Sequence, residues 1–150
     1  MLRRILEKSY YSFEDSFEDW RESIKASYVP LLKDEIVNEQ YIGSVIECIE
    51  KYGPYIIIAP NVAMPHSSQG ADGCRGTEVC FMKVKKAVKF YDEDGEKDAM
   101  IFFSLAADNS DKHIKNIQSL MEILLNENLV SDLLKVENEK MLKDVIEKYS

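Results

Sequence analysis

The residues best suited to chemistry in this chain are its two histidines, His66 and His113. Imidazole has a reference pKa of about 6.5, so near neutral pH a large fraction is unprotonated and can attack phosphorus or bind a metal ion. Pro65 fixes its own φ angle and pushes Met64 toward extended geometry, so His66 is presented from a stiff backbone. The alternative interpretation of His66 alone is a turn residue that hydrogen-bonds a neighbouring carbonyl.

Each histidine follows a short apolar run. Residues 55–59 are apolar throughout and lie between Gly53-Pro54 and Pro60-Asn61, which is typical of a central strand covered on both faces, although a piece of buried helix has the same pattern. Residues 100–107 form the run before His113. If the two strands are parallel neighbours, their carboxyl ends meet at the edge where open α/β sheets bind ligands. Both histidines would then face one crevice.

Residues 52–66, YGPYIIIAPNVAMPH, resemble the phosphorylation-site segment of enzyme IIA domains of the bacterial phosphoenolpyruvate-dependent sugar phosphotransferase system. The pattern G-P-Y-x-x-x-A-P-x-x-A-x-P-H is similar to the ascorbate-type branch of the mannitol/fructose class. The resemblance continues through residues 105–108 to His113 and covers roughly residues 16–149. The chain lacks the Arg-Glu pair and Gly-rich approach of mannitol and fructose members, which favours the ascorbate branch. Ser68 stands where ascorbate-type members often have a basic residue.

This resemblance implies an α/β fold, a mixed sheet of about five strands flanked by helices on both faces. It also implies a phosphocarrier, and so a phosphotransferase, in which His66 accepts phosphate from the phosphohistidine of HPr and passes it to a cysteine of an enzyme IIB. His113 would help to hold the phosphoryl group. Through a membrane enzyme IIC the relay would serve uptake of a sugar, with L-ascorbate as one candidate. Neither a metal nor a cofactor is expected.

Residues 67–76 contain three glycines and predict a mobile surface loop. The hydroxyls and backbone amides of Ser67 and Ser68 are candidate phosphate donors; the alternative is that these serines are solvated. Arg75 could pair with a phosphoryl group through its planar guanidinium, or be an ordinary solvated arginine. Cys48 is interpreted as a helix residue of no special reactivity, because no adjacent cation or helix N-terminus would lower its pKa.

The cap-forming residues 108–111 predict a helix with His113 in its first turn. Free amides and the positive end of the helix dipole favour a nearby anion such as phosphate, and the same field would lower the pKa of the imidazole. We therefore expect His113 to be a neutral hydrogen-bond donor, with an exposed first-turn residue as the alternative. The predicted buried stripe of this helix is Ile114, Ile117, Leu120, Met121 and Leu124.

Apolar periodicity predicts the remaining elements. An edge strand is expected near residues 10–13. A helix is expected to start at a capping box over residues 16–19 and to kink or break near Ala26, ahead of Pro30. Its stripe comprises Phe17, Trp20, Ile24, Tyr28 and Leu31. A second helix should run from Asn38 to Gly53, strands should cover residues 77–84 and 88–90, and residues 92–98 should form an exposed charged turn. Two short helices are expected after residue 128.

Length and composition favour one domain over residues 1–150, since 45% hydrophobic residues suffice for one substantial core. The net charge of −8 argues against nucleic acid and anionic membranes as partners. We expect a cytoplasmic protein, because no apolar segment approaches about 20 residues and the N-terminus turns polar too early for a signal peptide. Three cysteines without metal-site spacing suit a reducing compartment.

Two other functions remain open at this point. The first is a regulatory domain of the same fold that signals through protein contacts without passing phosphate onward. The second is a metal site formed by His66 and His113, although two ligands without a patterned carboxylate or thiolate make a poor site.

Overall fold

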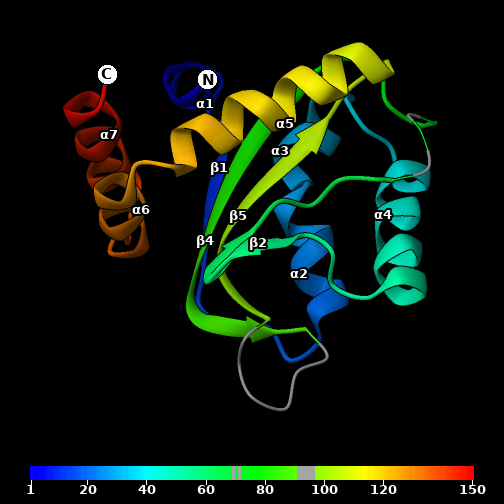
Figure 1. Ribbon diagram of the computed structural model, residues 1–150, viewed down its shortest axis with the longest axis horizontal. Helices are drawn as coiled ribbons and strands as arrows, with labels where there is room; N and C mark the ends of the chain where they lie inside the picture. Colours follow the sequence, from blue (N-terminus) through cyan, green and yellow to red (C-terminus); the bar gives the residue numbers. More distant parts are fainter. Residues whose placement is uncertain (69, 71, 91–96) are drawn as a thin grey trace.

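The computed structural model describes residues 1–68, 70, 72–90 and 97–150 (Figure 1). These residues form one mixed sheet made of β1 (Tyr11–Glu14), β2 (Ile57–Ala59), β3 (Asn61–Ala63), β4 (Glu78–Lys89) and β5 (Asp98–Ala106). Around it lie α1 (Leu2–Lys8), α2 (Trp20–Ser27), α3 (Val29–Lys33), α4 (Glu39–Tyr52), α5 (Ser110–Leu124), α6 (Glu127–Leu134) and α7 (Glu139–Lys148).

The strand order is β1-β4-β5-β3-β2. β1 pairs in parallel with β4, β4 is antiparallel to β5, and β3 runs parallel to β5 with Ala63 opposite Phe102. The carboxyl end of β3, which leads to His66, therefore lies beside the carboxyl end of β5, which leads to α5 and His113. The shared crevice was conditional on two parallel neighbours; these are β3 and β5, and the strand before His66 is β3 rather than residues 55–59.

The prediction of a central strand over residues 55–59 was wrong. Only Ile57–Ala59 is extended, as the edge strand β2, antiparallel to β3. Pro60 lacks an N–H, and Asn61 takes a left-handed φ of 65°, which turns the chain back on itself. The apolar run is therefore divided between a buried Ile56 and a three-residue edge strand whose side chains are only half-buried.

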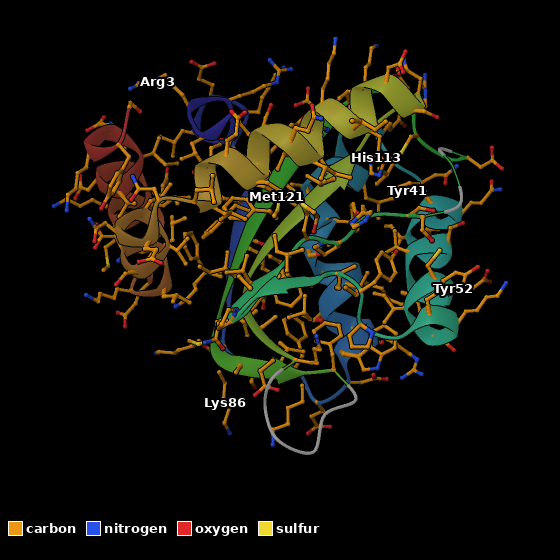
Figure 2. All side chains as sticks on the ribbon, in the orientation of Figure 1. Arg3, Tyr41, Tyr52, Lys86, His113 and Met121 are labelled. Atoms are coloured by element: carbon orange, nitrogen blue, oxygen red, sulfur yellow. The ribbon has the colours of Figure 1, made fainter. Side chains whose placement is uncertain are left out.

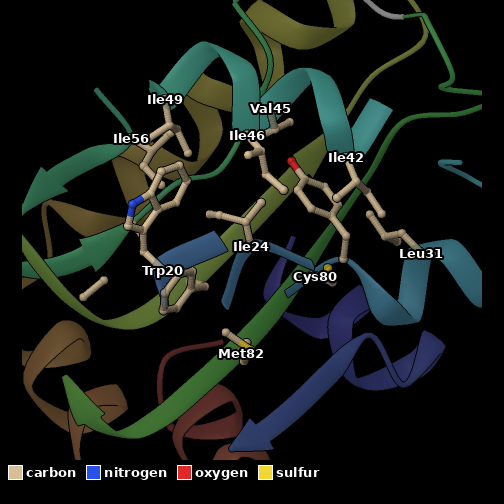
Figure 3. Packing of buried hydrophobic residues seen from close by; sticks show 14 of the residues in the cluster. Trp20, Ile24, Leu31, Ile42, Val45, Ile46, Ile49, Ile56, Cys80 and Met82 are labelled. Atoms are coloured by element: carbon tan, nitrogen blue, oxygen red, sulfur yellow. The ribbon is translucent and has the colours of Figure 1, made fainter. Parts of the chain in front are cut away.

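Helices cover both faces of the sheet, as predicted. Successive side chains of β4 alternate, so Cys80 and Met82 join one core cluster while Val79 and Phe81 join the other. Figure 3 shows the first cluster, in which α2, α3 and α4 pack against β4. Side chains of α1, α5, α6 and α7 form the second. In Figure 1 α4 lies on one side of the sheet and α6 and α7 lie on the other.

Helix ends follow local chemistry. The capping box predicted to begin at Ser16 was wrong: the N-cap is Asp19, whose carboxylate accepts a hydrogen bond of 3.1 Å from the Arg21 N–H. Of the predicted kink or break near Ala26, the structure has the break, because α2 ends at Ser27 and Pro30 lies in the first turn of α3. α4 begins after Asn38 and ends before Gly53, as predicted.

The remaining elements agree with the sequence apart from one merger. The strands predicted at residues 77–84 and 88–90 form the single strand β4, with a register shift between Lys83 and Val88. The predicted edge strand is β1, and the last two predicted helices are α6 and α7. Most of the predicted charged turn lies outside the described residues. Of the helices described, none is both long and apolar enough to cross a membrane.

Candidate functional site

His66 follows β3 and lies between two other aromatic rings. Its Nδ1 atom is 2.6 Å from the carbonyl oxygen of Met64. A carbonyl only accepts, so Nδ1 carries the ring proton and Nε2 keeps a free lone pair. The Tyr55 ring meets the imidazole edge-on at a centroid distance of 5.1 Å, and the His113 ring lies 5.4 Å away. The structure thus brings the two histidines together, as the strand order requires.

Both histidines line one open pocket of about 330 Å³. Ser67 and Ser68 line it too, so all four residues singled out from the sequence share this space. Its other walls are Tyr41, Gly70, Ala107, Asn109, Ser110 and Ile114. Figure 2 shows Tyr41 on α4 and His113 on α5 at the same end of the sheet. The pocket is therefore formed jointly by helices from opposite faces of the sheet.

Burial favours the neutral form of both imidazoles. It lowers the pKa of His66, the hydrogen bond to the Met64 carbonyl raises it in part, and the nearby His113 lowers it further. Burial also lowers the pKa of His113. The sequence attributed that shift to the field of the helix, whereas the cause found here is desolvation.

The two serines make contacts that the sequence does not reveal. The backbone N–H of Ser67, a predicted phosphate donor, lies 3.3 Å from the Tyr41 hydroxyl and donates to it. The Ser68 hydroxyl donates to the Sγ atom of Cys48 over 3.3 Å. Burial raises the pKa of the Cys48 thiol, but hydrogen bonds, chiefly from Ser68, outweigh burial and lower it overall. The prediction for Cys48 considered only cations and helix N-termini, whereas the lowering of its pKa comes from hydrogen bonds.

The segment after the pocket is held against the start of α4. The N–H of Asn38 donates to the Gly73 carbonyl over 3.0 Å, and the N–H of Arg75 donates to the Ile36 carbonyl over 2.8 Å. The described part of the predicted mobile loop is thus hydrogen-bonded rather than loose. The Arg75 guanidinium lies 3.7 Å from the Glu35 carboxylate and outside the pocket lining. Among the described residues no three His, Cys, Asp or Glu side chains cluster closely enough to hold a metal ion.

Three tyrosines behind the pocket were missed as site residues. The Tyr28 hydroxyl lies 2.9 Å from the carbonyl oxygens of both Pro65 and Leu105, and the Tyr41 hydroxyl lies 3.1 Å from the same Leu105 oxygen. Tyr55 donates a hydrogen bond to the His66 carbonyl. For Tyr28 and Tyr41 the available signal was tyrosine in place of phenylalanine in a predicted apolar stripe, because a buried phenol hydroxyl requires a partner. Tyr55 lies in the turn between α4 and β2 and has no such pattern.

α5 is less buried than its periodicity predicted. Of the predicted stripe, only Leu120 is fully buried, while Ile114 is 52% exposed and Met121 is 41% exposed. Leu125, just past the end of α5, is 79% exposed. Exposed apolar side chains that adjoin a pocket are typical of protein-binding surfaces. The helix that carries His113 therefore offers one exposed apolar side chain in the pocket wall, Ile114, and others further along its length.

Comparison with known proteins agrees with this arrangement. The family "Phosphoenolpyruvate-dependent sugar phosphotransferase system, EIIA 2" matches residues 4–149. The mannitol-specific cryptic phosphotransferase enzyme IIA component of Escherichia coli K12 is 34% identical over 139 residues, 93% of this chain and 92% of that protein. A solution structure of the mannitol-specific cryptic enzyme IIA from Escherichia coli has a TM-score of 0.85, at 33% identity and 98% coverage of both chains.

Two further proteins are more distant. The ascorbate-specific EIIA component of Mycoplasma pneumoniae is 28% identical over 134 residues, 87% of this chain and 81% of that protein. The enzyme IIA of Escherichia coli in a complex of mannitol enzyme IIA with phosphorylated enzyme IIB shares the fold, with a TM-score of 0.77, 21% identity, and 93% and 94% of the two chains covered. This chain therefore belongs to the EIIA type 2 family of the phosphotransferase system, the mannitol/fructose class, as a phosphocarrier component of sugar uptake.

Proposed function

We propose that His66 is the phosphoryl acceptor of this enzyme IIA and that Nε2 is the reacting atom. The hydrogen bond from Nδ1 to the Met64 carbonyl is the observation that carries this assignment, because it leaves the lone pair on Nε2 of a ring that lines the pocket. In the first step the phosphorus–nitrogen bond of phospho-HPr breaks as the bond to Nε2 forms. In the second, a cysteine thiolate of enzyme IIB attacks phosphorus and Nε2 leaves with its lone pair.

His113 and the start of α5 would stabilise the transferring group. Such transfer is catalysed mainly by fixed donors aimed at the charge on the phosphoryl oxygens. A neutral His113 can donate one hydrogen bond from a ring 5.4 Å from that of His66. Ser67, Ser68 and Ser110 contribute hydroxyls to the pocket wall. We propose His113 as the main stabilising side chain and Ser67 and Ser68 as auxiliary donors.

We propose HPr as the phosphate donor and enzyme IIB as the phosphate acceptor. The transfer would take place in the cytoplasm and would serve sugar uptake through a membrane enzyme IIC. The family match supports HPr, and the mannitol enzyme IIA found in complex with phosphorylated enzyme IIB supports the second partner. Both partners would approach the same pocket, beside the exposed Ile114 in its wall, with the exposed Met121 two turns further along α5. A pocket open to solvent permits the in-line approach that the transfer needs.

Two substrates are candidates for the transport system. The pattern ending at His66 favours L-ascorbate, whereas the greater overall identity to the mannitol-specific relative favours a hexitol. Transfer from the phosphorylated protein to purified ascorbate-type and mannitol-type enzymes IIB would separate them. The same assay tests the regulatory alternative, which predicts transfer to neither.

Labelling with phosphoenolpyruvate, enzyme I and HPr tests the acceptor. We expect one acid-labile phosphate per chain in the wild type and none in His66→Gln. Nitrogen NMR should show that the phosphate is attached to Nε2. The matched variant His113→Gln should still accept phosphate, but more slowly, because it loses a stabilising donor. Labelling of His66→Gln at the wild-type level would reject the assignment, and an unchanged rate in His113→Gln would reject the role of His113.

A further inference from the structure

Two buried phenol hydroxyls connect the chain segments that carry the histidines. We call Tyr28, at the end of α2, and Tyr41, in α4, the phenol brace. The Tyr28 hydroxyl lies 2.9 Å from the Pro65 oxygen and 2.9 Å from the Leu105 oxygen, so its one proton is shared between two carbonyls. The Tyr41 hydroxyl donates to Leu105 over 3.1 Å and accepts from the Ser67 N–H over 3.3 Å. The two rings pack edge-to-face at 5.7 Å.

The brace acts on both sides of the pocket at once. Pro65 and Ser67 are the two neighbours of His66 in the chain, and Leu105 lies near the end of the strand that leads to α5 and His113. The Leu105 N–H also donates to the Pro65 carbonyl over 2.9 Å, which joins the two segments beyond the last paired residues of β3. Any change at these carbonyls therefore changes the position of one imidazole relative to the other.

We infer that the phenol brace is a positioning device that sets the separation of the His66 and His113 rings during phosphoryl transfer. The inference rests on the proposed function of these histidines. Phenylalanine at either position would fill the same apolar space, so the hydroxyls are needed for their hydrogen bonds rather than for packing. Since misplacing a reacting group by about 1 Å can cost 10²-fold in rate, this positioning has a measurable consequence.

A purely structural role for these hydroxyls is the competing explanation, and the chain offers a matched control. Tyr10 is also buried in the same core cluster, and its hydroxyl donates to the Asp34 carboxylate over 2.8 Å, away from the pocket lining. Tyr28→Phe and Tyr41→Phe each remove two buried hydrogen-bonded contacts. Tyr10→Phe removes one part-buried hydrogen bond from the same cluster. It leaves the carbonyls of Pro65 and Leu105 untouched.

The experiment compares the three variants in phosphoryl transfer from phospho-HPr and by NMR. We expect the rate constant at saturating phospho-HPr to fall about tenfold in Tyr28→Phe and Tyr41→Phe, with KM within about twofold of the wild type, because docking is preserved. The pKa of His66 should rise in both, since a displaced His113 lowers it less. Nuclear Overhauser contacts between the two imidazoles should weaken. Tyr10→Phe should match the wild type in all three measurements.

Equal behaviour of the three variants would overturn the inference, as would a full rate in both brace variants. If one brace variant fails to fold, the other still decides the question, because both contact Leu105. Failure of the proposed function is a separate result. In that case the wild-type protein accepts no phosphate, while the imidazole contacts and the pKa of His66 still report whether the brace holds the rings together.

Discussion

At the scale of single residues, the pocket places two neutral imidazoles side by side. A nucleophilic nitrogen needs its lone pair, and burial lowers the pKa of both rings so that this lone pair persists below the usual pKa of histidine. A protonated His113 also opposes protonation of His66, because two imidazolium ions at a centroid distance of 5.4 Å repel. The chemistry therefore depends on which groups surround His66 as well as on the histidine itself.

The pH dependence of phosphate acceptance follows from these shifts. Because the folded pKa of His66 is lowered, the unprotonated ring predominates at pH 6.5, and the rate should fall only as the pH drops through the lowered value. In His113→Gln the midpoint of this fall should move to higher pH, since the neighbour that lowers the pKa is gone. Pulse labelling across pH 5–8 and NMR titration of His66 measure it. A midpoint that stays unchanged in the variant would contradict the coupling.

The site could be predicted in part from residue types. His66 and His113 stand out because they are the only histidines and each follows an apolar run. Tyr28 and Tyr41 could not be assigned in the same way, because in a helical stripe a tyrosine has the periodicity of any core residue. The carbonyls that their hydroxyls bind belong to segments distant in sequence. Only the packed sheet shows which carbonyls those are.

At the scale of secondary-structure elements, α5 combines two roles. Its first turn brings His113 to the pocket, and its outer face carries Ile114 and Met121, which remain partly exposed. An amphipathic pattern predicts that such side chains face the core of the same chain, but the same pattern serves a partner protein equally well. The sequence therefore predicts the helix but not which of its apolar side chains remain exposed to solvent.

Substitution on the exposed face of α5 tests its proposed role in docking. Met121→Lys should raise KM for phospho-HPr about fivefold, because it places a charge in an apolar interface contact. Thermal stability should stay near that of the wild type, because the side chain is partly exposed. Met141→Lys is the matched control: Met141 is 36% exposed on α7, and the substitution makes the same change of charge. Steady-state phosphorylation and thermal melts measure both effects. Equal values of KM in the two variants would exclude this face from docking.

The strands illustrate a second limit of prediction. Residues 55–59 are as apolar as a central strand, yet β2 lies at the edge of the sheet. The deciding feature is the reversal at Pro60 and Asn61, which gives two three-residue strands that are too short for periodicity to detect. The sequence offered parallel pairing only as a condition for bringing the two histidines together, and it did not predict β3, the strand that pairs with β5.

At the scale of the whole molecule, the pocket lies where the two helical layers meet. Tyr41 belongs to the layer of α2, α3 and α4, and His113 belongs to the layer of α5, α6 and α7. β4 and β5 contribute side chains to both core clusters. Neither helical layer can therefore detach without exposing the apolar face of these strands that it covers. A pocket built in this way exists only when both layers are docked on the sheet.

This arrangement predicts that residues 1–150 unfold as one cooperative unit. Trp20, the only tryptophan, is buried in the cluster beneath α2 and reports on that face, whereas Leu133 is fully buried in the cluster beneath α6. Leu133→Ala should cost about 2–5 kcal/mol through the cavity it leaves. Because the two clusters share β4 and β5, Trp20 fluorescence and far-ultraviolet circular dichroism should shift to the same lower urea midpoint. A Trp20 transition that stays at its wild-type midpoint would show instead that the two layers unfold independently.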